Sequence, residues 1–255
     1  MNKYSYKLRD WMLPYIDKLN FNELSTNKNA IKLLLDKNKI NYEYLCMNKN
    51  PIAIDILKCN IDKIDWFHLS FNKNAISILR NHKDKIIWYE LSANKCKDAI
   101  ELLEENLDNI DWDYLSANPY GLELLMKYPD KINWNYLSAN PNAIELLEEN
   151  QDKINWDKLS RNKNAIELLE ANQDKINWDY LSGNKNAIEL LEANQDKINW
   201  VLLSGNKNAI NLIKKNLDKI HWGMLSRNKN AIDILKENKD KINWNTISTN
   251  TSLFN

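Results

Sequence analysis

A tandem repeat with a period of 22 residues constrains this chain more than any other feature of its sequence. One sequence motif occurs twice in residues 150–200, and Trp156, Trp178 and Trp200 follow one another at 22-residue steps. A fixed period of roughly 20–50 residues is typical of repeat architectures, in which each unit packs only on its neighbours. We therefore expect an array of small units and not a globule with one central core.

One aromatic residue marks each unit, and the repeat extends through nearly the whole sequence. Eleven such anchors occur, most of them 22 residues apart: Phe21, Tyr42, Trp66, Trp88, Trp112, Trp134, Trp156, Trp178, Trp200, Trp222 and Trp244. We interpret residues 1–20 as an N-terminal cap helix, residues 21–250 as a solenoid of about eleven units and residues 251–255 as a tail. Stacked helices would give a curved rod on the order of 100 Å long.

The first half of each unit predicts a short helix. In the unit that begins at Asn140, this Asn suits the N-cap and Pro141 suits the first helical position. Apolar residues from Ala143 to Leu147 then recur at helical spacing. Asn150 occupies the place where a left-handed C-terminal residue is favoured. The fourth residue is Ala or Gly in ten units, which predicts a close approach of two backbones: Ala30, Ala53, Ala75, Ala99, Gly121, Ala143, Ala165, Ala187, Ala209 and Ala231.

The second half of each unit predicts another helix, with Asn155 as an example of its N-cap. Trp156, Leu159 and Ser160 then share one face, which we expect to be buried. We expect the repeated Ser to bond a backbone carbonyl and the Trp to pack in the core. Helices of roughly ten and seven residues are unstable alone in water, so stacking must stabilise them. The expected fold is an all-α solenoid of two-helix repeats.

A leucine-rich-type horseshoe is the alternative fold, because its repeats also have periods of roughly 20–29 residues and a recurring Asn. That architecture needs alternating apolar residues before the Asn. Here the sequence INWDYLSGN spaces its apolar residues at i and i+3, and Pro141 favours a helix start.

The repeat phrase resembles an uncharacterised class of tandem repeats from giant DNA viruses (mimivirus-like), with the pattern NPNAIxLLExNxDKIxWxxLSxN. Residues 138–162 carry this resemblance most fully, and it extends over about residues 15–250. Lys replaces the Pro of the pattern in most units. The resemblance implies a viral source but brings no settled activity with it.

No catalytic or metal-binding motif occurs in the sequence. His68, His82 and His221 lie in three separate units, and there is no HExxH, GxSxG or Gly-rich phosphate loop. A Ser that recurs in almost every unit indicates a structural role. We therefore expect no enzyme, no cofactor and no metal.

Two lysine ladders follow the array. One lies at the first position of the first helix in several units, at the helix N-terminus: Lys28, Lys73, Lys163, Lys185, Lys207 and Lys229. We expect these lysines to pair with Glu167 and Glu189 or to be solvated. The other ladder lies between the two helices of a unit, where each Lys follows an Asp, as in Asp152-Lys153. The 35 basic and 35 acidic residues of the chain disfavour a nucleic-acid partner without excluding one.

The positions that vary between units are the candidates for function. The residues one, two and five after each anchor point away from the buried face and include exposed aromatic residues and Met. As candidate partner-binding residues we select Tyr44, Phe67, Phe71, Tyr114, Tyr136, Tyr180, Leu202 and Met224. Such a surface predicts a non-enzymatic protein-binding scaffold. A nucleic-acid-binding helical repeat and a self-assembling structural protein are the alternatives.

Partners and location follow from the same observations. Ile247, Leu253 and Phe254 follow or end the last half unit, where an open end would allow self-association. There is no apolar run of about 18 residues and no apolar N-terminal segment, so we expect neither a membrane span nor a secretory signal. Three cysteines without a CxxC motif indicate a reducing compartment. We expect the cytoplasm, of a host cell if the protein is viral.

Overall fold

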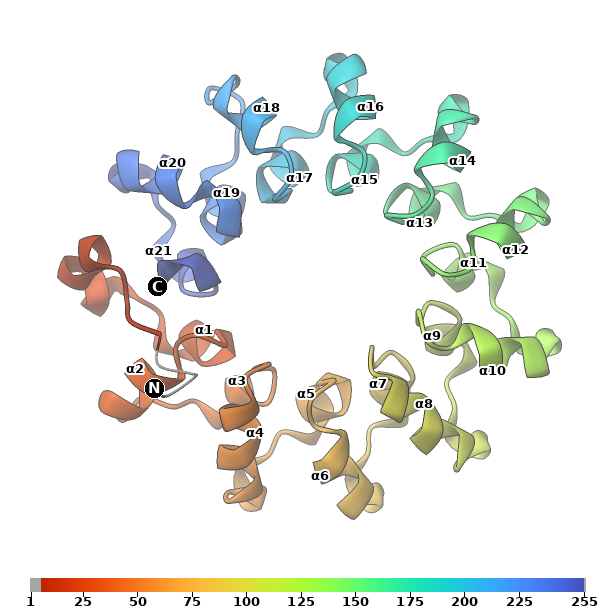
Figure 1. Ribbon diagram of the computed structural model, residues 1–255, viewed down its shortest axis with the longest axis horizontal. Coiled ribbons are helices and arrows are strands. Elements are labelled where there is room, and N and C mark those ends of the chain that lie inside the picture. The colour runs from red at the N-terminus through yellow and green to blue at the C-terminus, as the bar shows by residue number, and fades with distance from the viewer. Residues whose placement is uncertain (1–5, 255) are drawn as a thin grey trace.

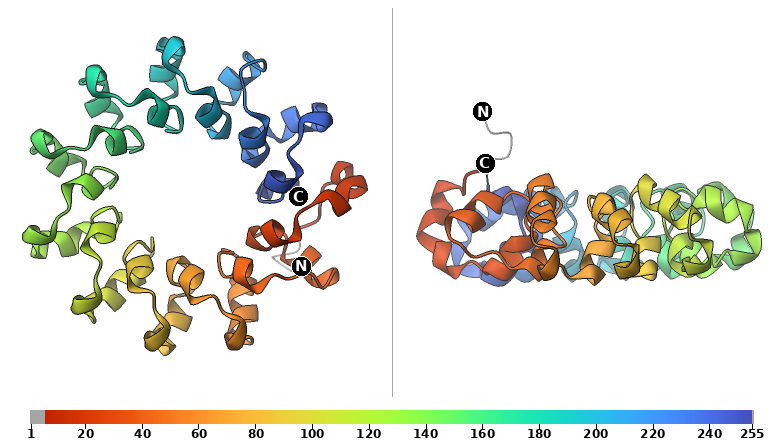
Figure 2. Two further views of the ribbon diagram at one scale, coloured as in Figure 1. Left: turned by 180° about the vertical axis from the view of Figure 1, so that it is seen from behind. Right: turned by 90° about the horizontal axis from the view of Figure 1, so that it is seen from below.

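The computed structural model describes residues 6–254, and they form a closed ring of short helices (Figure 1). Odd-numbered α-helices face the centre of the ring, and even-numbered α-helices form its outer row. Seen from the side, the ring is a flat band (Figure 2). Within the described residues, the only β pairing is an isolated bridge between Leu8 and Phe254. The expected all-α helical repeat solenoid is thus confirmed, and the leucine-rich alternative is wrong.

The inner helices begin at the anchor residue of each unit. They are α1 (Phe21–Thr26), α3 (Tyr42–Leu45), α5 (Trp66–Phe71), α7 (Trp88–Ser92), α9 (Trp112–Ser116), α11 (Trp134–Leu137), α13 (Trp156–Ser160), α15 (Trp178–Ser182), α17 (Trp200–Gly205), α19 (Trp222–Arg227) and α21 (Trp244–Ile247).

The outer helices begin, in most units, one residue after the conserved small residue. They are α2 (Ile31–Asp36), α4 (Pro51–Lys58), α6 (Ile76–Asn81), α8 (Lys97–Glu104), α10 (Leu122–Lys127), α12 (Ile144–Glu148), α14 (Ile166–Glu170), α16 (Ile188–Ala193), α18 (Ile210–Lys214) and α20 (Ile232–Glu237).

Short 3-10 helices fill most connections. They are η1 (Asp10–Lys18), η2 (Ile61–Lys63), η3 (Lys83–Lys85), η4 (Leu107–Asn109), η5 (Pro129–Lys131), η6 (Gln151–Lys153), η7 (Gln173–Lys175), η8 (Gln195–Lys197), η9 (Lys229–Ala231), η10 (Lys239–Lys241) and η11 (Thr251–Leu253).

The outer helices are shorter than the sequence predicts. The side chain of Asn140 accepts a hydrogen bond from the N–H of Asn142 at 3.0 Å, which forms a turn before the helix. The α-helix itself has 5 residues and begins at Ile144. Asn150 is not left-handed, since its φ is −132°. Its amide instead donates to the carbonyl of Leu146 at 2.9 Å, so the expectation of a left-handed residue here was wrong.

The inner helices form as the sequence predicts. Asn155 caps α13 by accepting from the N–H of Lys158 at 2.9 Å. Ser160 donates its hydroxyl proton to the carbonyl of Trp156 at 2.8 Å and accepts from the N–H of Asn177 in the next unit at 3.0 Å. The repeated Ser therefore joins neighbouring units, which confirms its structural role.

A second ladder of buried Asn side chains joins the turns between inner and outer helices. The amide of Asn184 donates to the carbonyls of Ser160 at 3.1 Å and Asn162 at 3.0 Å, both in the preceding unit. Its oxygen accepts from the N–H of Asn186 at 3.1 Å. Most units repeat this arrangement, so each buried carboxamide satisfies backbone groups in two turns.

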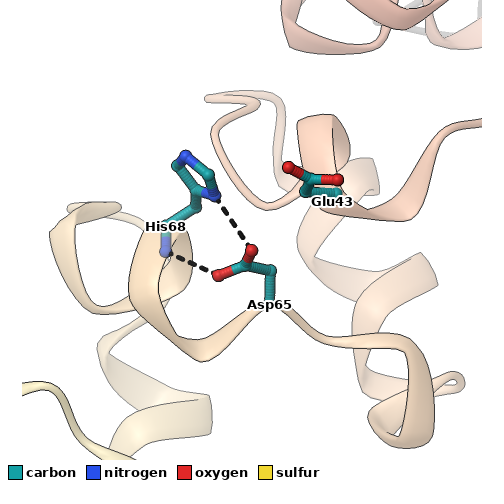
Figure 3. A group of neighbouring side chains, drawn as sticks. All are labelled: Glu43, Asp65 and His68. Carbon is teal, nitrogen blue, oxygen red and sulfur yellow. Dashed lines mark hydrogen bonds and ion pairs between the residues drawn. The ribbon is translucent and has the colours of Figure 1, made fainter.

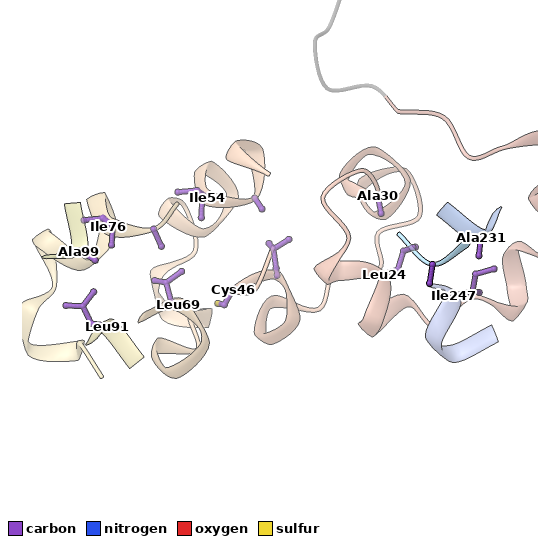
Figure 4. Packing of buried hydrophobic residues seen from close by; sticks show 14 of the residues in the cluster. Leu24, Ala30, Cys46, Ile54, Leu69, Ile76, Leu91, Ala99, Ala231 and Ile247 are labelled. Atoms are coloured by element: carbon purple, nitrogen blue, oxygen red, sulfur yellow. The ribbon is translucent and has the colours of Figure 1, made fainter. Parts of the chain in front are cut away.

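The apolar core lies between the inner and outer rows and continues from unit to unit. Figure 4 shows it from Leu91 and Ala99 through Leu69 and Ile76 to Leu24, all of them buried. Three of the small residues show the close approach of two backbones that the sequence predicts. Ala165 and Ala187 have no exposed surface, and a Cβ at Gly121 would lie 2.5 Å from the carbonyl oxygen of Leu115.

The first and last units close the ring through the contacts that join all other units. The amide of Asn27 donates to the carbonyls of Ser248 at 3.1 Å and Asn250 at 3.2 Å. The hydroxyl of Ser248 accepts from the N–H of Asn20 at 3.0 Å. The core is continuous across this seam, where Ile247 lies near Leu24 (Figure 4). The chain is therefore a ring and not the expected curved rod.

The N-terminal segment supplies the part that the last half unit lacks. The N–H of Arg9 donates to the carbonyl of Leu253 at 2.9 Å, and the rings of Tyr15 and Trp244 stack with centroids 5.0 Å apart. Ile247 and Leu253 have no exposed surface, and Phe254 is 5% exposed. The expected open end for self-association is therefore wrong, because residues 6–29 cover it. The expected cap helix over residues 1–20 contains the 3-10 helix η1, and η1 and residues 251–254 of the expected tail 251–255 both belong to this seam. Residues 1–5 of the cap and residue 255 of the tail lie outside the described residues.

Candidate functional site

The inner wall of the ring carries the candidate residues on the first turns of the odd-numbered helices. On this wall, Phe67 is 44% exposed and Tyr114 is 40% exposed. Tyr136 and Tyr180 are half-buried. The caps fix this geometry, since Asn133 accepts from the N–H of Tyr136 at 3.3 Å. The varying positions thus present side chains away from the core, as the sequence predicts.

Four aromatic side chains on four consecutive inner helices form one continuous row, here called the aromatic row: Phe67, Tyr89, Tyr114 and Tyr136. Ring centroids lie 6.2 Å apart between Phe67 and Tyr89, 6.0 Å between Tyr89 and Tyr114, and 5.9 Å between Tyr114 and Tyr136. These distances fall within the range of favourable aromatic pairs. Desolvation by these neighbours, with the nearby charges of Tyr136 and Glu90, raises the pKa of Tyr114.

Tyr89 completes this row, although the sequence selection omitted it. It lies one residue after its anchor Trp88, whereas Tyr114 and Tyr136 lie two residues after theirs. The ring centroids of Tyr89 and Tyr114 nevertheless lie 6.0 Å apart, so the two positions meet on the inner wall. An aromatic residue at either position in neighbouring units was the signal that could have identified Tyr89.

Cationic side chains follow the aromatic row along the wall. The Nζ of Lys158 lies 3.7 Å from the ring centroid of Tyr136, and the Cζ of Arg161 lies 3.7 Å from that of Tyr180. Both distances are typical of cation–π contacts. Tyr180 is thus covered by Arg161 and does not extend the row.

The other selected residues lie apart from the aromatic row. Tyr44 is on α3, Leu202 is on α17 and Met224 is on α19, and all three are half-buried. Phe71 ends α5 and is 49% exposed. The structure therefore brings together three of the eight selected residues.

The Trp ladder packs as expected and is not an open stacking surface. The Trp side chains are half-buried and contact the core. A lysine from the following unit covers the ring in several units, as where Nζ of Lys197 lies 4.4 Å from the ring of Trp178. Most lysines of these loops therefore make a cation–π contact with the aromatic anchor of the preceding unit. Only two of these loop lysines, Lys85 and Lys131, lie within 4.0 Å of the preceding Asp among the described residues.

One group of side chains near the aromatic row has the composition of a metal site. Glu43, Asp65 and His68 offer ligand atoms that all lie within 4.8 Å of one another (Figure 3). The Oδ1 of Asp65 already accepts from the backbone N–H of His68 at 3.1 Å. The Oδ2 of Asp65 lies 3.2 Å from the Nδ1 of His68. The sequence did not indicate this group, because Glu43 comes from another unit. Its signal is Asp65, which replaces the usual Asn.

The usual Asn at this position donates its amide to the preceding unit, as Asn133 does to Asp113 at 2.7 Å. Asp65 has no such proton to offer Glu43, so two carboxylates face each other there. His68 is placed to offset this repulsion when protonated.

No helix within residues 6–254 is long and apolar enough to cross a membrane. Comparison with protein families, with curated proteins and with solved structures finds no match to this chain.

Proposed function

We propose that this protein is a non-enzymatic scaffold that binds a protein partner on the inner wall of the ring. The observation that carries this proposal is the aromatic row. Phe67, Tyr89 and Tyr114 are 44%, 41% and 40% exposed although they contact one another. Contiguous exposed aromatic surface is typical of interaction sites, and Tyr and Phe are enriched at interfaces.

The length of the row indicates the size of the bound segment. The row crosses four helices, and packed helices lie roughly 8–10 Å apart, so it extends over about 25–30 Å. An extended chain advances about 3.3 Å per residue, so a segment of about eight residues would cover it. We propose that this segment presents apolar side chains, because rigid aromatic rings bind these at a low cost in side-chain entropy.

The source of the protein is a proposal that rests on the repeat resemblance alone, and its location rests on that resemblance and on the three cysteines without a CxxC motif. A repeat of the giant-virus type implies a viral protein in the cytoplasm of an infected cell. The partner would then be a host or viral protein.

A selection from a displayed peptide library tests the proposal without knowledge of the partner. Peptides are selected on the immobilised protein and then measured against the triple variant Tyr89→Ala, Tyr114→Ala and Tyr136→Ala. The matched control is Tyr120→Ala, which removes another exposed ring, 49% exposed, outside the inner wall. Circular dichroism checks that each variant keeps its helices.

We expect the selected peptides to lose at least tenfold in affinity for the triple variant, since central aromatic residues of an interface each contribute more than about 1 kcal/mol. The control variant should bind as the wild type does. Peptides that bind the folded triple variant unchanged, or a selection that yields none, would refute the inner wall as the site.

A further inference from the structure

One edge of the ring carries cations without balancing acids over four consecutive units. The segments 161–164, 183–186, 205–208 and 227–230 each run from the end of an inner helix towards the outer helix that follows. Their charged residues are all basic, and we call this set the basic edge: Arg161, Lys163, Lys185, Lys207, Arg227 and Lys229. The loops on the other side of these units are balanced, since each contains an Asp-Lys pair.

The Asn ladders hold the cations of the basic edge side by side. Asn186 donates its amide to the carbonyl of Lys163 at 2.8 Å, and Asn208 donates to the carbonyl of Lys185 at 2.9 Å. Asn230 repeats this bond to Lys207 at 2.9 Å. Each lysine backbone is thus fixed to the turn of the next unit, and the lysines follow one another at the spacing of the units.

The charges of the basic edge have no acidic partner. Within residues 6–254, no Asp or Glu lies within 4.0 Å of any of its six charged groups. The pairing that the sequence suggested, with Glu167 and Glu189, is therefore absent from this edge. The guanidinium of Arg161 lies over the face of the Tyr180 ring and forms no ion pair with a described acidic residue, which leaves its charge available to an anion.

Two shallow depressions make the basic edge a groove. One of about 390 Å³ has Arg161, Lys163 and Lys185 in its lining. The other, of about 370 Å³, is lined by Lys185 together with Lys207 and Lys229. Lys185 borders both, so the two depressions are neighbours along the edge. Neither lining contains an acidic residue, and small residues such as Gly183 and Gly205 keep the floor low.

We propose that the basic edge binds the phosphate backbone of a single-stranded nucleic acid that follows the turns of the ring. A curved groove with cations at each unit fits a flexible polyanion, and a duplex is too stiff to follow it. A flat anionic membrane would contact the rims and leave the depressions unfilled. The zero net charge of the chain does not oppose binding, because the compensating acids lie on other surfaces.

Fluorescence anisotropy with labelled oligothymidylates and oligouridylates of about 4, 8, 12 and 20 nucleotides tests this site. The site variant is Lys163→Gln, Lys185→Gln and Lys207→Gln. The control variant is Lys214→Gln, Lys215→Gln and Lys236→Gln, which removes the same charge from exposed lysines in or directly after the outer helices α18 and α20. Circular dichroism and a mass measurement verify the fold of both variants.

We expect affinity to rise with length and to level off by about 12 nucleotides, since the groove extends over only part of the ring. The site variant should bind at least tenfold more weakly at low salt, and its log–log salt slope should be shallower by about 2, at roughly 0.7 per lost phosphate contact. The control variant should lose much less.

Absence of binding to any oligonucleotide at low salt would overturn the proposal, and so would equal losses in the two variants. Vesicles with about 30 mol% phosphatidylserine provide the last arm. Binding to these vesicles without binding to oligonucleotides would assign the edge to a membrane surface and overturn the nucleic-acid site. The aromatic row is a separate surface, so the peptide experiment is decided independently.

Discussion

Ring closure predicts that an Asn at the seam stabilises the fold as much as an Asn in the middle of the chain. The two positions are Asn27, whose amide crosses the seam, and Asn184, whose amide joins two internal units. They are 2% and 3% exposed, and each donates two hydrogen bonds and accepts one. The matched substitutions are Asn27→Ala and Asn184→Ala.

The expected loss follows from these three hydrogen bonds. Each intramolecular hydrogen bond contributes about 1 kcal/mol, and carbonyls left buried without a partner add to the cost. We therefore expect each substitution to lower the free energy of unfolding by about 2–4 kcal/mol. Because the two environments match, the two losses should agree within about 1 kcal/mol. In a chain that is open at the seam, the amide of Asn27 would have no carbonyl of Ser248 or Asn250 to bind. Asn27→Ala would then lower the free energy of unfolding by less than about 0.5 kcal/mol.

Urea unfolding followed by circular dichroism and by Trp fluorescence measures both losses. Coincidence of the two signals tests whether unfolding is two-state. Hydrogen exchange at the N–H of Arg9, which donates to the carbonyl of Leu253 at 2.9 Å, reports on the seam directly. A small loss for Asn27→Ala beside a large loss for Asn184→Ala, with rapid exchange at Arg9, would refute ring closure.

Three further predictions concern the framework. Ser182→Ala removes the bond to the carbonyl of Trp178 at 2.8 Å and the acceptor for the N–H of Asn199 at 2.9 Å, so urea unfolding should show a loss of about 1–3 kcal/mol. An unchanged midpoint would contradict this role. Lys197→Gln removes the cation over Trp178 and should cost about 0.5–1 kcal/mol by the same assay, with no loss indicating a solvated lysine. Burial raises the pKa of the Cys46 thiol from 9.0 to about 11, so its contribution to stability is present below pH 9 and is lost as pH rises towards 11. Replacement of Cys46 by Ser should remove that part of the alkaline loss in unfolding experiments across this range, and an unchanged loss would contradict the assignment.

The fold was predictable because the same physical requirements recur in each unit. The inner-helix caps, the buried Ser and the small residue at the helix contact all follow from local chemistry that the sequence states repeatedly. The length of the outer helices was not predictable in this way. An Asn at position 140 can cap a turn as readily as a helix. Which of the two forms depends on the carbonyls of the preceding unit that bind the Asn140 amide.

Ring closure could not be read from the repeat because it depends on a small rotation accumulated over every unit. The contacts across the seam, such as those of Asn27 with Ser248 and Asn250, reveal that the sum completes a turn. The segment before Phe21 keeps the Asp-Lys-x-Asn-aromatic ending of the repeat at residues 17–21 but has lost the apolar first half, so only a partial signal of its match to the last half unit remains in the sequence.

The candidate surfaces were predictable only in part. Of the eight residues selected from the periodicity, Phe67, Phe71 and Tyr114 are exposed and the other five are half-buried. The contact between Tyr89 and Tyr114 could be found only once the inner helices were placed in space. The basic edge could not be predicted from the net charge, because the net charge of a chain does not tell on which side of the ring each charge lies. The Asp65–Glu43 approach likewise required two units to be placed in space.

The seam has a consequence for the order of the units along the chain. Its bonds are the same as those of the internal joints, so physically the ring has no first unit. Linking the present ends and opening another turn would give a circular permutant with the same set of contacts. By the same reasoning, a whole unit duplicated inside the array keeps the two ends complementary. A twelfth unit would reduce the rotation per joint only from roughly 33° to 30°, which is well within the variation of helix packing angles. Half a unit added at either end would destroy the match, so such a ring can change size only by whole units.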